Sequence, residues 1–265
     1  MSTSTIQAHD VPKPPSRLKH LLTVALVALI LMGSAWQVEF SFSQLWAGIP
    51  NIGDLLVQMW PPNAAYAAEV MAPILETVRM ALLGTTFGAI LALPIALLSA
   101  RNIFATGWIT LPARMVMNFI RTMPDLLLAA LFVAIFGIGP VSGVFALTFF
   151  SLGIISKLIY ETIESVDRAP LEAMTAVGAN KIVWITFGVF PQIAASFLSY
   201  TLYSLEVNVR AAAILGLVGA GGIGLYYEST LGFFQYGRVA TIILLTLLVV
   251  MLIDYLSTKG RERLA

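Results

Sequence analysis

The sequence contains no cysteine, so it offers no disulfide, no thiolate metal ligand and no cysteine nucleophile. Its two histidines, His9 and His20, both lie in the polar N-terminal segment, which nearly excludes a histidine-based metal or catalytic site. Charged residues make up 11% of the chain, against about 25% in a typical soluble domain, and 58% of the residues are hydrophobic. This leaves too few polar side chains to cover a globule in water, and the chain is too apolar for disorder. We therefore predict an integral membrane protein.

The chain also lacks the signatures of nucleotide and nucleic-acid binding. Its net charge is +1, from 15 basic and 14 acidic residues without a basic block, so we expect no nucleic-acid partner. No Gly-x4-Gly-Lys-Ser/Thr motif occurs, which excludes a P-loop for ATP, and we expect no cofactor or metal bound by this chain. One Gly-x-Gly-x-x-Gly match at 219–224 has no βαβ context, so it indicates close backbone packing or a flexible turn.

Long apolar segments predict an all-α, polytopic membrane protein. The six expected spans are 21–36, 70–99, 108–136, 141–160, 183–208 and 239–256. Nine basic residues fall on one side of the membrane if both termini are cytoplasmic, which is the side that positive charge favours. These residues are Lys13, Arg17, Lys19, Arg101, Arg168, Lys181, Lys259, Arg261 and Arg263. Arg238, at the outer start of the last span, is the exception.

The same reading divides the chain into four parts. Residues 1–20 form a cytoplasmic tail, 21–69 an accessory span with an outer segment, 70–258 a core of five spans, and 259–265 a second cytoplasmic tail. Between residues 42 and 62 of the outer segment, apolar side chains and two tryptophans recur at helical spacing. This pattern predicts one or two amphipathic helices on the outer membrane surface; the alternative is an apolar loop packed on the bundle.

The loop between the fourth and fifth spans carries the most informative motif. It runs Glu172-Ala173-Met174, then three residues, Gly178, twelve residues and Pro191. Pro170 suits the first turn of a short helix, Glu172 lies near its positive end, and Gly178 suits the left-handed position that stops it. A capped connecting helix without a partner would show the same features, but it would not require this spacing.

The spacing resembles the EAA loop of the membrane subunits of bacterial ABC importers. Met174 and Gly188 stand where that pattern has alanine and isoleucine, and Phe190 stands where it has leucine. The resemblance implies that residues 169–181 form a coupling helix that docks on an ATPase subunit. The residues it assigns to this contact are Glu172, Ala173, Met174, Gly178, Ala179 and Asn180.

The resemblance extends over residues 76–265 and is closest to the phosphonate permease family. The residues that carry it are 156–158, 178–181 with 188–192, and 199–203 with 206–210. It implies a permease for phosphonates in the bacterial inner membrane, surrounded by membrane lipid. The implied partners are a second permease copy, most simply in a homodimer, two ABC ATPases that hold ATP and Mg²⁺, and a phosphonate-type binding protein. Phosphite or hypophosphite is the alternative substrate, followed by methionine or another small solute. A secondary transporter is the alternative of another class. An intramembrane enzyme is a third, for which the chain offers only Ser156-Lys157.

Three arginines in or beside the spans have an acidic residue at helical spacing, which places both groups on one helix face. The pairs are Glu76 with Arg79, Arg121 with Asp125, and Glu206 with Arg210. Each pair either braces the bundle or lines a hydrated path, because an unpaired charge in the membrane is costly. Arg114 has no such partner and can extend to the cytoplasmic surface.

For the third pair we favour the path, because Asn208 adds polarity and the glycine-rich run 216–224 follows. Arg210 would then donate to an anionic solute, and Glu206 would keep the binding weak enough for conduction. The braced alternative is favoured for Arg79 and Arg121. The candidate path residues are Glu206, Asn208, Arg210, Arg79 and Arg121.

Overall fold

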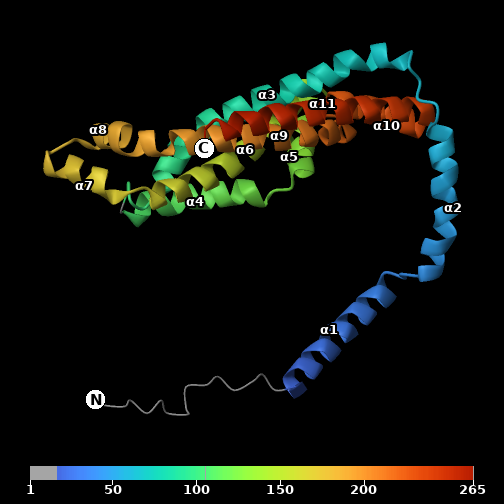
Figure 1. Cartoon of the computed structure of the whole chain (residues 1–265), viewed down its shortest axis with the longest axis horizontal. Helices are drawn as coiled ribbons and strands as arrows, with labels where there is room; N and C mark the ends of the chain where they lie inside the picture. Colours follow the sequence, from blue (N-terminus) through green and yellow to red (C-terminus); the bar gives the residue numbers. More distant parts are fainter. Residues whose placement is uncertain (1–16, 105, 265) are drawn as a thin grey trace, which may run out of the picture. The chain divides into compact units, whose positions relative to one another are not determined.

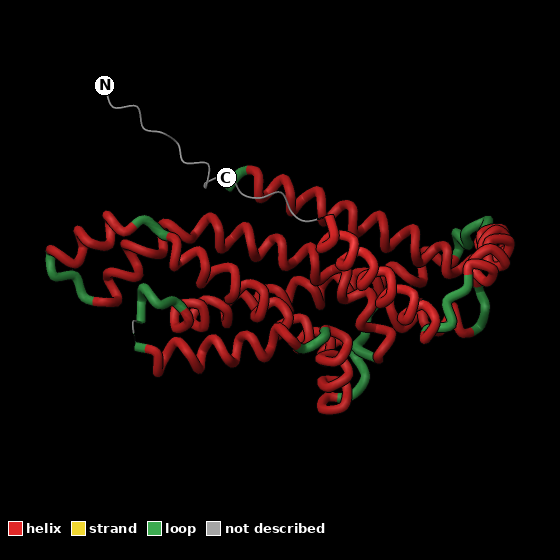
Figure 2. The backbone as a smooth tube through the Cα atoms, turned by 90° about the horizontal axis from the view of Figure 1, so that it is seen from below, coloured by secondary structure: helices red, strands yellow, loops and turns green. Residues whose placement is uncertain are grey.

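The computed structural model describes residues 17–104 and 106–264, and every regular element in these residues is a helix (Figures 1 and 2). Five helices are long and apolar enough to cross a membrane, and a bent pair brings the number of spans to six. The prediction of an all-α, polytopic membrane protein is therefore confirmed. The chain forms two compact units, residues 1–56 and 57–265, which we describe separately.

The first unit contains the accessory span and the start of the amphipathic segment. Helix α1 (Arg17–Gln37) includes the predicted span 21–36 and buries none of its apolar window. Helix α2 (Phe42–Met59) continues through Pro50 without a break, so the segment is one helix and the loop alternative is wrong. Its apolar side chains include Trp46, which is 78% exposed. Its location on a membrane surface stays a prediction.

The second unit is a bundle of four long helices that run side by side (Figures 1 and 2). They are α3 (Tyr66–Ser99), α6 (Pro140–Ser165), α9 (Phe190–Leu215) and α11 (Tyr236–Glu262). Helix α6 is the most enclosed, with 61% of its apolar window buried. Small residues on α3 allow its backbone to approach α6, as is common between membrane helices. A Cβ atom added at Gly88 would lie 2.8 Å from the carbonyl oxygen of Thr148.

We expect Gly88→Val to lower the melting temperature of the protein in detergent, because a branched side chain would force α3 and α6 apart. Overpacking of this kind costs about 1–3 kcal/mol. Gly33→Ala is the matched control, since Gly33 lies within helix α1 and has no atom within 4 Å of an added Cβ. Equal melting temperatures for Gly88→Val and wild type would show that the α3–α6 contact tolerates expansion.

The predicted third span, residues 108–136, is not one straight helix. It consists of α4 (Gly107–Thr122) and α5 (Asp125–Phe136), whose axes differ by 93°. Met123 and Pro124 between them are extended, with ψ angles of 126° and 139°. Proline has no N–H for the helix ladder and disfavours helical backbone in the residue before it, which accounts for the break. The predicted span is therefore a pair of helices bent at Pro124, which has the form of either a broken span or a re-entrant loop.

Short helices cap the two ends of the bundle, which we call the α7 end and the α10 end (Figure 1). At the α7 end, α7 (Arg168–Ala176) leads to α8 (Lys181–Val183) and a π-helical segment (Trp184–Val189) that continues into α9. At the other end, a 3-10 turn (Gly216–Val218) leads to α10 (Ile223–Gly232). The fifth span is thus longer than predicted, since helical backbone runs from Lys181 to Val218.

The glycine-rich run at the α10 end is a point of close backbone packing. A Cβ atom on Gly216 would lie 2.5 Å from the Cα atom of Gly224, and Gly222 has a φ of +71° that favours glycine. Helix α3 holds this turn: Glu76 accepts a hydrogen bond from the backbone N–H of Gly222 (2.9 Å), and Thr77 accepts one from Ile223 (2.8 Å). The packing interpretation of the Gly-x-Gly-x-x-Gly match is confirmed.

Candidate functional site

Helix α7 is defined by its own residues at both ends. At the start, the Asp167 carboxylate accepts a hydrogen bond from the backbone N–H of Ala169 (3.0 Å). At the end, Gly178 adopts a φ of +75°, and the N–H groups of Gly178 and Ala179 donate to the carbonyls of Thr175 and Met174, both at 3.0 Å. These two bonds form a Schellman motif. The predicted short helix with a glycine stop is confirmed.

The next turn is also capped. Asn180 accepts a hydrogen bond on its side-chain oxygen from the N–H of Val183 (2.9 Å), so it is the N-cap of α8. The ammonium group of Lys181 lies 4.4 Å from the centre of the Trp184 ring. Asn180 thus has a defined structural role in addition to the contact that the resemblance implies.

One side of α7 is fixed to the start of α9. Leu171 is 5% exposed and belongs to the apolar cluster that contains Val189 and Ile193. The indole N–H of Trp184 donates to the carbonyl of Leu171 (3.1 Å). Gln192 closes the base of the loop: its side-chain oxygen accepts from the N–H of Asp167 (2.9 Å), and its amide donates to the carbonyl of Asp167 (3.3 Å).

Two departures from the EAA pattern compensate each other in space. A Cβ atom on Gly188 would lie 3.0 Å from the sulfur of Met174 and 2.7 Å from a methyl group of Leu171. The larger side chain at position 174 therefore occupies room that the missing side chain at position 188 leaves. Met174 is half-buried, and its side chain fills the space between α7 and the segment that contains Gly188.

The other side of α7 is open. Glu172, Ala173 and Gly178 are exposed, and Val177 is 82% exposed. A carboxylate therefore stands next to apolar side chains on a short, rigid helix. Exposed apolar surface of this kind, rimmed by polar groups, is typical of a protein contact.

Of the three predicted charge pairs, only Glu206 with Arg210 forms within its helix. The Arg210 guanidinium donates to one Glu206 oxygen (2.7 Å), and Arg261 donates to the other (2.9 Å). Arg210 also lies 3.5 Å from Asp254 of α11. Glu206 is 14% exposed. Two positive and two negative groups thus form a neutral cluster, which we call the α9–α11 charge cluster, that joins these helices.

The other two predicted pairs, Glu76 with Arg79 and Arg121 with Asp125, do not form. Glu76 binds the backbone of Gly222 instead of Arg79, and the break at Pro124 separates Arg121 from Asp125. Within residues 17–104 and 106–264, neither Arg79 nor Arg121 has a carboxylate oxygen within 4.0 Å. Both side chains are exposed, so the expectation that they are neutralised braces was wrong.

Arg114 is also better partnered than the sequence indicated. Its guanidinium donates to Glu164 (2.6 Å) and to the backbone carbonyl of Ser99 (2.9 Å), and it lies 4.6 Å from the centre of the Tyr160 ring. This arginine joins α4 to α3 and α6. The prediction of an unpartnered side chain that extends to water was wrong.

Asn208 lies inside the bundle, and the expectation that it faces a hydrated path is not what the structure shows. Its side chain is fully buried and donates to Thr85 (2.7 Å) and to Ser151 (2.6 Å), while Ser204 also donates to Ser151 (3.0 Å). These four residues form a polar contact between α3, α6 and α9. Interhelical hydrogen bonds of this type contribute on average about 0.6 kcal/mol in membrane proteins.

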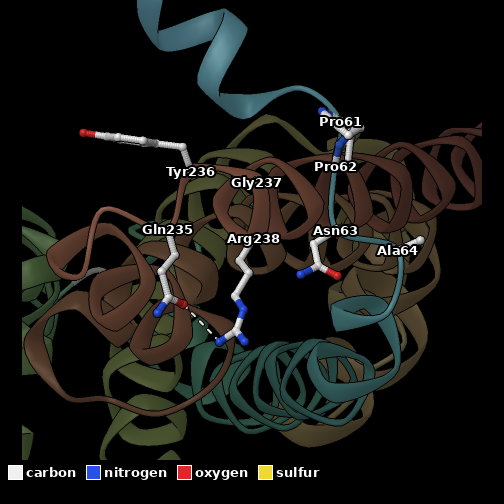
Figure 3. Close-up of a pocket in the computed structure, with 8 residues that line it drawn as sticks. All are labelled: Pro61, Pro62, Asn63, Ala64, Gln235, Tyr236, Gly237 and Arg238. Atoms are coloured by element: carbon white, nitrogen blue, oxygen red, sulfur yellow. Dashed lines mark hydrogen bonds between the residues drawn. The ribbon is translucent and has the colours of Figure 1, made fainter.

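Arg238, the exception to the charge asymmetry, lines a pocket of about 570 Å³ at the α10 end. Figure 3 shows its side chain and that of Asn63 extending into this pocket, while Tyr236 points away. Arg238 donates to Gln235 (3.0 Å) and lies 4.8 Å from the centre of the Tyr66 ring. Within the described part of the chain, no three His, Asp or Glu side chains gather into a potential metal site.

Comparison with known proteins identifies the class. Residues 84–259 match the family model of the binding-protein-dependent transport system inner membrane component. The chain belongs to this family. It is a membrane permease subunit of an ABC importer, as the α7 motif indicated, and the alternatives of a secondary transporter and of an intramembrane enzyme are set aside.

Several relatives of this chain are named for the transport of phosphorus compounds. The chain is 36% identical to a putative phosphite transport system permease protein of Stutzerimonas stutzeri, over 95% of this chain and 90% of that one. It is 37% identical to the phosphate-import permease protein of Mycolicibacterium smegmatis, over 86% of this chain and 43% of that one. A putative cryptic phosphonate transport system permease protein of Escherichia coli K12 is 39% identical over 44% of this chain and 96% of its own length.

A solved structure supports the fold of the permease core. An inward-facing conformation of the MetNI methionine ABC transporter superposes with a TM-score of 0.68 at 21% identity. The match covers 77% of this chain and 99% of that one. At this identity the likeness is one of fold, and it agrees with the methionine-permease-like architecture that the sequence predicted.

Proposed function

We propose that this permease forms the transmembrane path for oxyanions of phosphorus, with phosphonate as the expected substrate and phosphite as the alternative. The observation that carries the proposal is the set of relatives named for phosphite, phosphate and phosphonate transport. These compounds share a tetrahedral phosphorus centre with charged oxygens. The methionine alternative rests on a likeness of fold at 21% identity, which does not extend to a substrate.

The proposed assembly contains two copies of this chain, most simply as a homodimer, with two ABC ATPases at the α7 end. The ATPases would hold ATP and Mg²⁺, since the chain has no P-loop motif. The exposed side of α7, with Glu172, Ala173, Gly178 and Asn180, would dock on the ATPase. A phosphonate-type binding protein would deliver the solute at the α10 end. Both termini of the chain would then lie on the ATPase side of the inner membrane.

Uptake into proteoliposomes tests this function. Vesicles would contain the permease with its ATPase, with ATP inside and the binding protein outside. We expect ATP-dependent uptake of labelled methylphosphonate or phosphite, with competition between the two, and no uptake of methionine. Transport of methionine in preference to the phosphorus compounds would contradict the substrate class. Uptake by the permease alone, driven by a proton gradient, would contradict the proposed dependence on the ATPase.

A further inference from the structure

Arg121, like Arg79, differs from the other arginines that lie along the bundle. Arg114, Arg210 and Arg261 each bind a carboxylate, whereas Arg121 has no carboxylate oxygen within 4.0 Å among the residues that the structure describes. It occupies the last turn of α4, directly before the 93° break, and its side chain is exposed. The break therefore presents a positive charge that the chain itself does not neutralise.

Arg121 lies far from both ends of the bundle, so its charge indicates what surrounds the middle of the permease. Its side-chain stem lies against Gly153 of α6, since a Cβ atom there would be 2.8 Å from the Cγ atom of Arg121. Gly153 is the middle of the helix Pro140–Ser165, so each end of α6 is about 20 Å away. An arginine side chain cannot extend over that distance to bulk water, and in lipid an unpaired guanidinium is costly.

Arg79 also has no carboxylate oxygen within 4.0 Å among the described residues, and it lies thirteen residues, about 20 Å, from the start of α3. An unpaired charge at either arginine therefore requires a hydrated surface or a partner copy. Arg121 differs in its place, because its stem lies against Gly153 in the middle of α6 and it directly precedes the break between α4 and α5.

Two other polar side chains accompany Arg121 on the exposed side of α4, next to the exposed ring of Phe119. Asn118 and Thr122, on the same turns of α4, are exposed as well. Gly153 leaves room for the arginine stem on the buried side, while the side chain as a whole is exposed. A surface with these three polar side chains is unsuited to lipid and suited to a water-filled route.

We propose that Arg121, seated on Gly153 at the break between α4 and α5, contacts the transported oxyanion midway along the translocation route. This inference rests on the proposed function, which supplies the ligand class. Two symmetry-related copies would bring two guanidinium groups to the route, which matches a dianion in charge. Asp125 starts α5, where the helix N-terminus stabilises its carboxylate, and its charge would keep the anion from binding too tightly for release.

The experiment compares Arg121→Gln, Arg121→Lys and Gly153→Ala with wild type in the proteoliposome assay. We expect Arg121→Gln to keep its folded yield and its oligomeric state and to lose at least tenfold in uptake of methylphosphonate and phosphite. Arg121→Lys should recover part of the uptake, because the charge remains. Gly153→Ala should reduce uptake less than Arg121→Gln, because it displaces the stem without removing the charge. Arg101→Gln, an exposed arginine at the α7 end, is the matched control and should transport normally.

Two outcomes would overturn the inference. One is normal uptake by Arg121→Gln in a system where wild type transports a phosphorus oxyanion. The other is loss of folded or dimeric Arg121→Gln protein that Asp125→Asn restores, which would make Arg121 a brace between copies. Failure of wild type to transport any phosphorus oxyanion would count against the proposed function instead, so the two failures are distinguishable.

Discussion

In the assembled importer, Glu172→Lys is expected to abolish the ATP hydrolysis that the loaded binding protein stimulates, while the permease stays folded. Glu172 is exposed and makes no hydrogen bond to the bundle through its side chain in the described structure, so its replacement leaves the packing of α7 intact. Reversal of a charge in a polar docking contact costs several kcal/mol, which is enough to uncouple the ATPase. The measurement is phosphate release by the complex in proteoliposomes, together with the melting temperature of the permease.

Glu262→Lys is the matched control, because Glu262 is an exposed glutamate in the last turn of α11 and undergoes the same charge reversal. We expect this variant to retain stimulated ATPase activity. Stimulated hydrolysis at the wild-type rate by Glu172→Lys would remove α7 from the proposed ATPase contact. A drop in its melting temperature would mean that the residue has a structural role that the geometry does not show.

The second large effect is expected at the α9–α11 charge cluster. Glu206→Gln removes the one carboxylate that binds both Arg210 and Arg261, and it leaves two positive groups close together. Glu206 is 14% exposed, whereas Arg210 and Arg261 are 48% and 30% exposed, so its loss should cost less than the roughly 3–5 kcal/mol of a fully buried pair. We still expect a measurable fall in folded protein and in melting temperature. Arg210→Gln should cost less, because Glu206 keeps Arg261. A double-mutant cycle in detergent measures the coupling between the two positions.

This expectation differs from the path-lining hypothesis that the sequence favoured for Arg210. In a brace, the variant that combines Glu206→Gln with Arg210→Gln is more stable than Glu206→Gln alone. If Arg210→Gln instead stays folded, keeps basal ATPase activity and loses uptake, and the double variant is not rescued, then Arg210 serves the anion. The neutral charge count of the cluster favours the brace.

Local features of this chain could be read from its sequence, and contacts between distant residues could not. Helix α7, with its proline, its glycine stop and its exposed glutamate, follows from residues within one short segment. The long apolar runs predicted five of the six spans, with bounds that shift by up to six residues except at the end of the fifth, which extends ten residues further. The break in the remaining span was signalled by Pro124, but a proline within a membrane helix is compatible with either a kink or a break.

The charged and polar positions were harder to predict for the same reason. Helical spacing places Glu76 and Arg79 on one face, yet the carboxylate binds the backbone of Gly222, which is 146 residues away. Arg114 donates a hydrogen bond to Glu164, which is 50 residues away in the sequence, and Asn208 donates one to Thr85, which is 123 residues away. A single sequence carries no signal for such pairs. The spacing rule succeeded only for Glu206 and Arg210, and Arg261 was absent from that prediction.

The two hydrogen bonds between Asp167 and Gln192 have a mechanical consequence. Asp167 precedes α7 and Gln192 lies in the first turn of α9, so these bonds close the base of the segment from α7 to α9. We therefore expect a force applied at Glu172 to be transmitted to the start of α9. Asn208 lies sixteen residues further along α9, about 24 Å away, where this helix is hydrogen-bonded to α3 and α6. A displacement of α7 would thus be expected to reach the centre of the bundle as shear across these buried hydrogen bonds.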